Sequence, residues 1–257
     1  MRWAGLVSSI ALGAFAFAPA SGHAGGRPYA FTQGTETLPE TGLEIETWLG
    51  ADRPRASTTG PTWDWWIGPT LGLTDQLEVS LFTIFVQPAN GPNGGSLSLS
   101  SSRLYVSYLL APRGEWFADV RVRGEFDLPV GKNKDDPRPL PFLALLPTVW
   151  LSVLASTELG PVNVTVNLGT YMELERSTLS PAAHYSVAAA VDVLEGLKLG
   201  VETFGEGKID QTRPFQFFAG PVLGYGHGRL WLATTLGFGL SDRSSQQRGR
   251  MVVGIAF

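Results

Sequence analysis

Residues 116–127 have the sequence WFADVRVRGEFD, and this stretch decides the fold class. One parity is apolar or small and carries Trp116, Ala118, Val120, Val122, Gly124 and Phe126. After Phe117, the other parity is fully charged and carries Asp119, Arg121, Arg123, Glu125 and Asp127. An alternation with a period of two is typical of a β-strand that has one polar and one apolar face.

The same alternation continues from Thr41 to Phe257. We count twelve stretches of roughly ten residues or more that place an apolar row on one parity. The stretch from Phe142 to Ser156 is the least regular, because both of its parities are largely apolar. The last stretches include Phe215 to Tyr225 and Arg248 to Phe257. The chain also contains 31 Gly and 18 Pro, which disfavour long helices. The pattern therefore predicts an all-β fold.

Alternation alone fits two folds, because a soluble sandwich buries its apolar row and a membrane barrel turns that row toward lipid. Four features favour the barrel. The stretches are as long as tilted membrane-spanning strands. Tight connections, such as residues 194–196, alternate with long ones, such as residues 128–141. Large aromatic residues lie near the ends of the stretches, as in the girdles of membrane barrels. The even number of stretches leaves both termini on one side. We therefore predict a membrane-spanning antiparallel up-and-down β-barrel of about 12 strands over residues 41–257.

The composition argues against several other classes of protein. The chain has no Cys, only 16% charged residues and a formal net charge of −4. Without Cys there is no disulfide framework and no thiolate site. The acidic balance argues against a nucleic-acid partner.

Residues 1–24 have the layout of a secretory signal peptide. Met1-Arg2 gives a positive start, and the uncharged apolar run from Ala4 to Ala18 follows. Small residues then lead to a predicted cleavage site after Ala24, with Ala20 as the second choice. A retained membrane anchor is the weaker alternative, because about 15 apolar residues are short for a helical span. Residues 25–40, here called the leader, are polar and are expected on the periplasmic side, where they could thread into the mouth of the barrel.

The chain resembles a known group of proteins. Its last eight residues, RMVVGIAF, alternate and end on Phe257, and they resemble the assembly signal of bacterial outer-membrane barrels. Thr37-Leu38-Pro39 and the phrase GLTDQLE at residues 72–78 are similar to the outer-membrane family named for the MetA pathway of phenol degradation. The resemblance covers residues 35–257. It implies export to the outer membrane of a Gram-negative bacterium and passage of small molecules. The implied partners are outer-membrane lipid and lipopolysaccharide, small solutes, and the barrel-assembly machinery through Phe257.

If the apolar row meets lipid, the charged row lines the lumen. The predicted lumen-lining residues are Glu44, Glu46, Asp64, Glu78, Arg103, Asp119, Arg121, Arg123, Glu125, Asp127, Glu173, Glu175, Lys198, Glu202 and Arg250. So many charges require water or ion pairs, because a lone buried charge is costly. Acids outnumber bases ten to five in this set, so an open lumen is expected to prefer cations mildly.

Twelve strands lie between the filled eight-stranded barrels and the open porins of sixteen or more. One hypothesis is therefore an outer-membrane porin-like channel for passive passage of small solutes. The alternative is a structural or ligand-binding barrel with a plugged lumen. A third hypothesis, membrane-bound hydrolysis by His184 and Ser186, is disfavoured because parity turns both side chains inward and no GxSxG motif is present. We expect no enzyme activity, catalytic residue, metal site or cofactor.

One motif occurs twice. Residues 68–72 have the sequence GPTLG, and residues 220–224 have the sequence GPVLG. Proline inside a strand loses a ladder hydrogen bond, so each motif predicts a local bulge.

Overall fold

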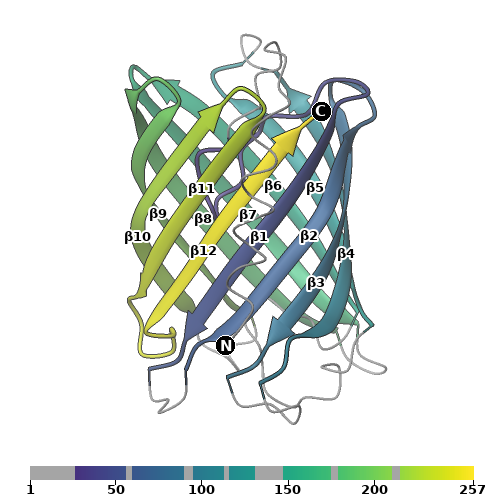
Figure 1. Ribbon diagram of the computed structural model, residues 1–257, viewed down its shortest axis with the longest axis vertical. Helices are drawn as coiled ribbons and strands as arrows, with labels where there is room; N and C mark the ends of the chain where they lie inside the picture. Colours follow the sequence, from purple (N-terminus) through teal and green to yellow (C-terminus); the bar gives the residue numbers. More distant parts are fainter. Residues whose placement is uncertain are drawn as a thin grey trace, which may run out of the picture.

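The computed structural model describes residues 27–55, 60–89, 95–112, 116–130, 147–174, 179–209 and 215–257. Within these ranges the chain forms a closed antiparallel barrel in which each strand pairs with its neighbours in sequence and the last pairs with the first (Figure 1). The strands are β1 (Leu43–Arg53), β2 (Thr62–Gly72), β3 (Leu77–Gln87), β4 (Ser98–Ala111), β5 (Asp119–Pro129), β6 (Thr148–Leu159), β7 (Val162–Leu174), β8 (Leu179–Leu194), β9 (Leu197–Lys208), β10 (Gln216–His227), β11 (Leu230–Gly239) and β12 (Gln247–Ala256).

The predicted up-and-down barrel of about 12 strands is confirmed. The least regular stretch differs most from its predicted bounds. β6 is described from Thr148 and continues to Leu159, three residues beyond the predicted end. Residues 142–146, predicted as the start of this strand, lie outside the described residues, as does the predicted signal peptide. Where the chain is described, it holds no helix of the length and apolarity that a membrane crossing requires.

The two ends of the barrel differ. The end that carries the C-terminus has tight connections, such as those between β8 and β9 and between β10 and β11 (Figure 1). We call it the turn end, and there the backbone N–H of Phe257 donates to the carbonyl of Leu43 (2.8 Å). The opposite, loop end carries the longer connections, such as residues 54–61 and 88–97. The connections at the turn end are thus mostly shorter than those at the loop end, with the connection between β7 and β8 as a short exception.

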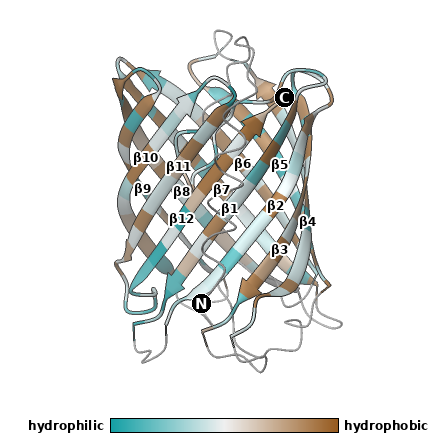
Figure 2. Ribbon diagram, viewed as in Figure 1, coloured by the Kyte–Doolittle hydropathy of each residue, from teal (hydrophilic) through white to brown (hydrophobic). Residues whose placement is uncertain are grey.

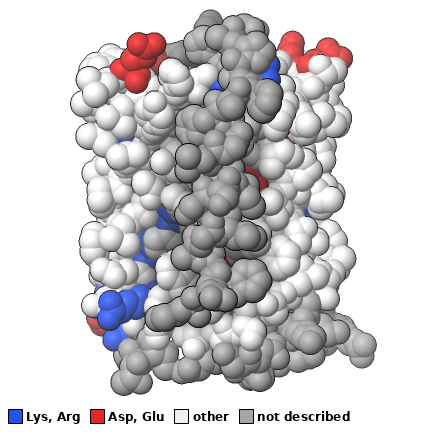
Figure 3. Space-filling model, in the orientation of Figure 1, with Lys and Arg blue, Asp and Glu red and all other residues white. Residues whose placement is uncertain are grey.

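The apolar row faces outward along every strand whose burial is described in full. Leu81 of β3 is 52% exposed and Leu151 of β6 is 59% exposed. Hydrophobic and hydrophilic residues alternate along the strands (Figure 2). Much of the wall on the viewed face is uncharged, and the acidic side chains visible there gather mainly at the turn end (Figure 3). Such an exterior suits contact with hydrocarbon, since a soluble barrel would expose its charged row instead.

The two GPxLG motifs lie at equivalent places, on β2 and β10. At each one the pairing with the following strand skips two residue pairs, around Pro69 and around Pro221. The register is the same on both sides of each gap, so the predicted bulge is wrong. Each proline interrupts the hydrogen-bonded ladder without adding a residue to it.

Candidate functional site

Most of the predicted lumen residues are enclosed by the barrel. Those buried from solvent are Glu44, Glu46, Glu78, Arg103, Arg121, Arg123, Asp127, Glu202 and Arg250. The side chain of Glu125 is only 9% exposed, and one carboxylate oxygen of Asp64 is fully buried. The strand parity that the sequence marks as charged is thus the inward one.

Three of the predicted residues lie elsewhere or less deeply, and a fourth is not described. Asp119 and Glu173 are half-buried near opposite ends of their strands. Lys198 lies at the turn end, where its Nζ is 2.8 Å from the exposed carboxylate of Asp192, so it belongs to the rim of the barrel and not to its bore. Glu175 lies outside the described residues.

The charges in the lumen are arranged in pairs. Arg103 binds Asp127 through Nε (3.0 Å) and through Nη2. Arg123 approaches Glu125, with 3.1 Å between Nη2 and the carboxylate. The first pair joins direct partners in the register of β4 and β5, and the second joins two inward positions of β5 that are two residues apart. Pairing offsets part of the cost of removing these charges from water.

Sequence reasoning missed a further ion cluster at the loop end. Nε of Arg248 donates to the carboxylate of Asp52 (2.6 Å), and its Nη1 lies 3.5 Å from Glu206. Asp52 and Arg248 are direct partners in the register of β1 and β12. Asp52 and Arg248 are not among the predicted lumen residues, because their pairing depends on the closure of the barrel.

The described part of the leader runs inside the barrel. From the turn end it reaches the middle of β9, where the carboxylate of Glu202 accepts the backbone N–H groups of Phe31 (3.2 Å) and Thr32 (2.9 Å). It then returns toward the turn end, where the backbone N–H of Leu38 donates to Glu78 (3.2 Å). The leader therefore fills the turn-end half of the lumen.

Two leader side chains anchor its first residues. A guanidinium nitrogen of Arg27 lies 3.1 Å from Glu46. Burial by itself lowers the pKa of Arg27, but the nearby carboxylates of Glu46 and Glu44 outweigh burial and raise that pKa. The hydroxyl of Tyr29 lies within hydrogen-bond distance of the backbone oxygen (2.9 Å) and side-chain oxygen (2.8 Å) of Asn163. Burial is the main cause that raises the pKa of Tyr29, so its phenol stays protonated while the leader is docked.

Arg121 holds the returning part of the leader. It donates to the backbone carbonyl of Glu36 (2.7 Å) and forms an ion pair with Glu78. The side-chain amide of Asn167, in the orientation that satisfies both of its groups, binds the backbone N–H (2.7 Å) and carbonyl (3.0 Å) of Gln33. The leader backbone is thus bound by side chains that were predicted from the sequence and by others, such as Asn167, that were not.

The repeated motif has a place in this docking. The last glycine of the first copy, Gly72, lies against Pro39, and a Cβ there would come within 2.1 Å of the Pro39 carbonyl oxygen. The last glycine of the second copy, Gly224, lies against Pro28, and a Cβ there would come within 2.9 Å of the Pro28 Cα. Each copy leaves space for the backbone of one arm of the leader.

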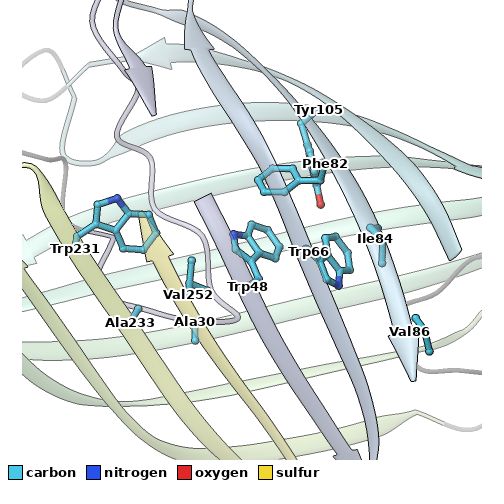
Figure 4. Packing of buried hydrophobic residues seen from close by; sticks show 10 residues of the cluster. All are labelled: Ala30, Trp48, Trp66, Phe82, Ile84, Val86, Tyr105, Trp231, Ala233 and Val252. Carbon is cyan, nitrogen blue, oxygen red and sulfur yellow. The ribbon is translucent and has the colours of Figure 1, made fainter. Parts of the chain in front are cut away.

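Aromatic side chains share the inward row with the charges, and these aromatic residues are not among the predicted lumen-lining residues. Trp48 and Trp66 stack with ring centroids 5.1 Å apart, and Phe82 and Tyr105 extend the cluster across β3 and β4 (Figure 4). Trp231 lies on the other side of the same cluster and donates from Nε1 to Glu44 (2.7 Å). These residues have the same strand parity as the charged row, and this parity is the feature of the sequence that could have placed them in the lumen.

Guanidinium groups lie over several of these rings. Arg103 lies over Trp66 and Trp150, at 4.7 and 5.3 Å from the ring centroids. Arg123 lies 4.0 Å over Tyr105. Arg250 lies 4.4 Å over the leader residue Phe31 and 5.2 Å over Trp48. Cation–π contacts of this kind are stronger in a desolvated site than at an exposed one.

A cavity remains in the lumen between the leader and the loop end. It holds about 100 Å³ of water-accessible volume. Phe31 and Gln33 of the leader line its turn-end side, and strands from most of the circumference line the rest. Gly50 of β1 pairs with Arg250 on one side and with Asp64 on the other. Because Gly50 has no side chain, the side chains of Asp64 and Arg250 can approach each other across β1.

His184 is part of the cavity wall. Its Nε2 lies 3.1 Å from Oγ of Ser152, and its ring meets the edge of Trp150. His184 lies on β8 and its partner Ser152 lies on β6. This contact differs from the pair of His184 and Ser186 that the sequence suggested. Across the described ranges, no group of three or more His, Asp or Glu side chains is placed to hold a metal ion.

The barrel resembles solved structures of bacterial outer-membrane channels. The COG4313 outer membrane channel from Pseudomonas putida F1 aligns with a TM-score of 0.62 and 15% identity, over 87% of this chain and 98% of that one. The KdgM porin aligns with a TM-score of 0.54 and 11% identity, over 83% of this chain and 99% of that one. The NanC porin aligns with a TM-score of 0.54 and 9% identity, over 84% of this chain and 98% of that one.

These comparisons confirm that the chain has the fold of bacterial outer-membrane β-barrels. No family model and no curated protein sequence matches the chain. The similarity to the family named for the MetA pathway therefore still rests on the short motifs described above.

Proposed function

We propose that this protein is a porin-like channel of the bacterial outer membrane, through which small solutes pass without chemistry. The observation that carries the proposal is the enclosed polar bore: buried ion pairs and a residual cavity lie inside a closed wall whose outer face is apolar. A barrel with this distribution faces lipid outside and water inside. The likeness in fold to outer-membrane channels and porins supports the same function.

The proposed orientation follows from the connections. Outer-membrane barrels place short turns in the periplasm and longer loops outside the cell. The turn end, with both ends of the barrel sequence and the entry of the leader, would then face the periplasm. The cavity on the loop side of the leader would be reached from outside, and the apolar row would contact outer-membrane lipid.

The leader sets the conductance in this proposal. Docked between Glu202, Arg121 and Glu78, it occupies the turn-end half of the bore, so passage requires the leader to be narrow enough or to move aside. This occupancy also favours the second candidate function, a ligand-binding barrel whose lumen stays closed.

Single-channel recordings of the full-length refolded protein in planar bilayers separate the two functions. A channel gives discrete current steps, and a variant that weakens leader docking, Glu202→Ala, gives larger or longer ones. If neither protein conducts ions or admits small solutes in liposome swelling, the closed barrel is correct and the channel is wrong.

A further inference from the structure

The cavity on the loop side of the leader differs in charge from the lumen as a whole. The charged row as a set contains more acids than bases, which predicts a mild preference for cations. Among the described residues that line the cavity, however, Arg103, Arg123 and Arg250 are cationic and Glu125 is the only acid. The side chains that line the cavity thus carry more bases than acids, although Asp127 and Glu125 form ion pairs with two of the three arginines.

Two of the side chains that line the cavity carry a buried hydrogen-bond donor that has no partner among the described residues. Trp150 is only 8% exposed, and its Nε1 has no hydrogen-bond partner among the described residues. Nε of Arg123 is likewise buried without a partner, although Nη2 of the same side chain reaches Glu125. Leaving a buried donor unsatisfied is costly, so such groups at a cavity often mark the place of a bound acceptor.

The shape of the cavity is set by flat groups. The guanidinium of Arg103 lies over the rings of Trp66 and Trp150, and that of Arg123 lies over Tyr105. Because rings lie against these guanidinium groups, an anion would approach their N–H edges, where Asp127 and Glu125 already contact Arg103 and Glu125 contacts Arg123. The water-accessible volume of about 100 Å³ is on the scale of one six-membered ring, since an apolar cavity of about 150 Å³ accepts benzene.

We propose that this cavity binds a small organic anion that has a flat apolar body, of the size and kind of a single-ring carboxylate. The carboxylate would lie among Arg103, Arg123 and Trp150, where charge-assisted hydrogen bonds are strongest. The ring would lie against the aromatic wall, and the leader residue Phe31 would close the cavity on its turn-end side. As a statement of what the channel carries, this inference rests on the proposed function; as a statement of binding, it is tested separately.

Isothermal titration calorimetry on the full-length protein, refolded in detergent micelles at pH 7, tests the proposal with four probes. Benzoate is flat and anionic, cyclohexanecarboxylate is anionic but not flat, benzyl alcohol is flat and neutral, and benzylammonium is flat and cationic. Benzoate is expected to bind about tenfold or more tightly than benzyl alcohol and benzylammonium, because hydrogen bonds to charged groups discriminate on this scale. Cyclohexanecarboxylate is expected to bind several-fold more weakly than benzoate.

Variants locate the site. Arg123→Gln is expected to weaken benzoate binding about tenfold, and Trp150→Phe, which keeps a ring but removes the donor, to weaken it several-fold. Arg53→Gln makes the same change at an exposed position near the loop end and is expected to leave the affinity unchanged. If Arg123→Gln misfolds, the benzoate affinity of Trp150→Phe alone tests the location of the site. Equal binding of benzylammonium and benzoate, or benzoate affinity unaltered by Trp150→Phe, would overturn the proposal.

The same measurements distinguish failure of this proposal from failure of the channel. Benzoate binding without conductance would contradict the channel and leave the binding site standing. Conductance without benzoate binding would leave the channel standing and overturn the site.

Discussion

The ring of Phe31 in the leader stacks on the ring of Phe204 in β9, with centroids 3.9 Å apart and 15° between the planes. Phe204 in turn stacks on Phe218 of β10, at 5.1 Å and 11°. Two residues before Phe204 on the same strand, Glu202 accepts the backbone N–H groups of Phe31 and Thr32. The innermost part of the leader is therefore held by β9 through an aromatic stack and a buried carboxylate together.

Glu202→Ala tests the carboxylate. The substitution removes the carboxylate that accepts the N–H groups of Phe31 and Thr32, and each hydrogen bond to a charged group contributes about 1.5–3 kcal/mol. We expect amide hydrogen exchange in the leader to become at least about tenfold faster in the folded barrel. Glu195→Ala, at the exposed turn between β8 and β9, is the matched control and should leave leader exchange unchanged. Unaltered exchange in the Glu202 variant would mean that the leader is held elsewhere.

The close approach of the leader to Gly224 gives a second prediction. In Gly224→Ala the new methyl group would lie 2.9 Å from both Cα and the carbonyl oxygen of Pro28, so the backbone of the leader must shift. We expect faster proteolysis of the leader and larger current steps. Gly124→Ala in β5 is the control, because a Cβ there meets no atom within 4 Å. Equal behaviour of the two variants would show that the twin GPxLG motifs do not dock the leader.

Tyr29 predicts how docking depends on pH. Burial raises the pKa of Tyr29 in the docked leader, whereas the phenol of a released leader titrates near its ordinary pKa of about 10. Docking is therefore fully stabilised below about pH 10 and is lost progressively above it, as the released form loses its proton. Conductance recorded between pH 8 and 11 should rise at the alkaline end. Tyr29→Phe should lack this dependence on Tyr ionisation, and an unchanged alkaline rise in that variant would assign it to another group.

The fold could be predicted from sequence because strand parity is a local property. In β5, Val122 and Arg123 face opposite sides whichever strand lies next to them, so the inward and outward rows follow directly. The pair of Asp52 and Arg248 could not be predicted in the same way, because it depends on the register between the first and last strands. Strand parity identifies which residues of a strand face inward. Only the closure of the barrel determines which inward residues of the first and last strands become neighbours.

The aromatic part of the lumen was missed for a related reason. Trp65 and Trp66 are adjacent and therefore face opposite sides, so only one of them can belong to an outward girdle of aromatic residues. Inside the barrel, Trp66 is 1% exposed because it packs against Trp48 and lies under Arg103 and Arg250. An inward row need not be polar where the lumen is filled by rings, guanidinium groups and a leader.

The orientation of the apolar row can be tested by the cost of a charge at two depths. Leu81 is exposed in the middle of β3, and Leu73 is exposed in the turn between β2 and β3. If the wall contacts lipid, Leu81→Arg places a guanidinium near the bilayer midplane and should destabilise the folded barrel by about 2–4 kcal/mol, whereas Leu73→Arg near the interface should cost about 0–1 kcal/mol. Urea titration of folding into phospholipid vesicles measures both changes. In a barrel surrounded by water the two exposed positions would tolerate Arg equally, because neither substitution would remove the charge from solvent. A difference of about 2 kcal/mol between the two variants therefore requires a low-dielectric surrounding at Leu81 and not at Leu73.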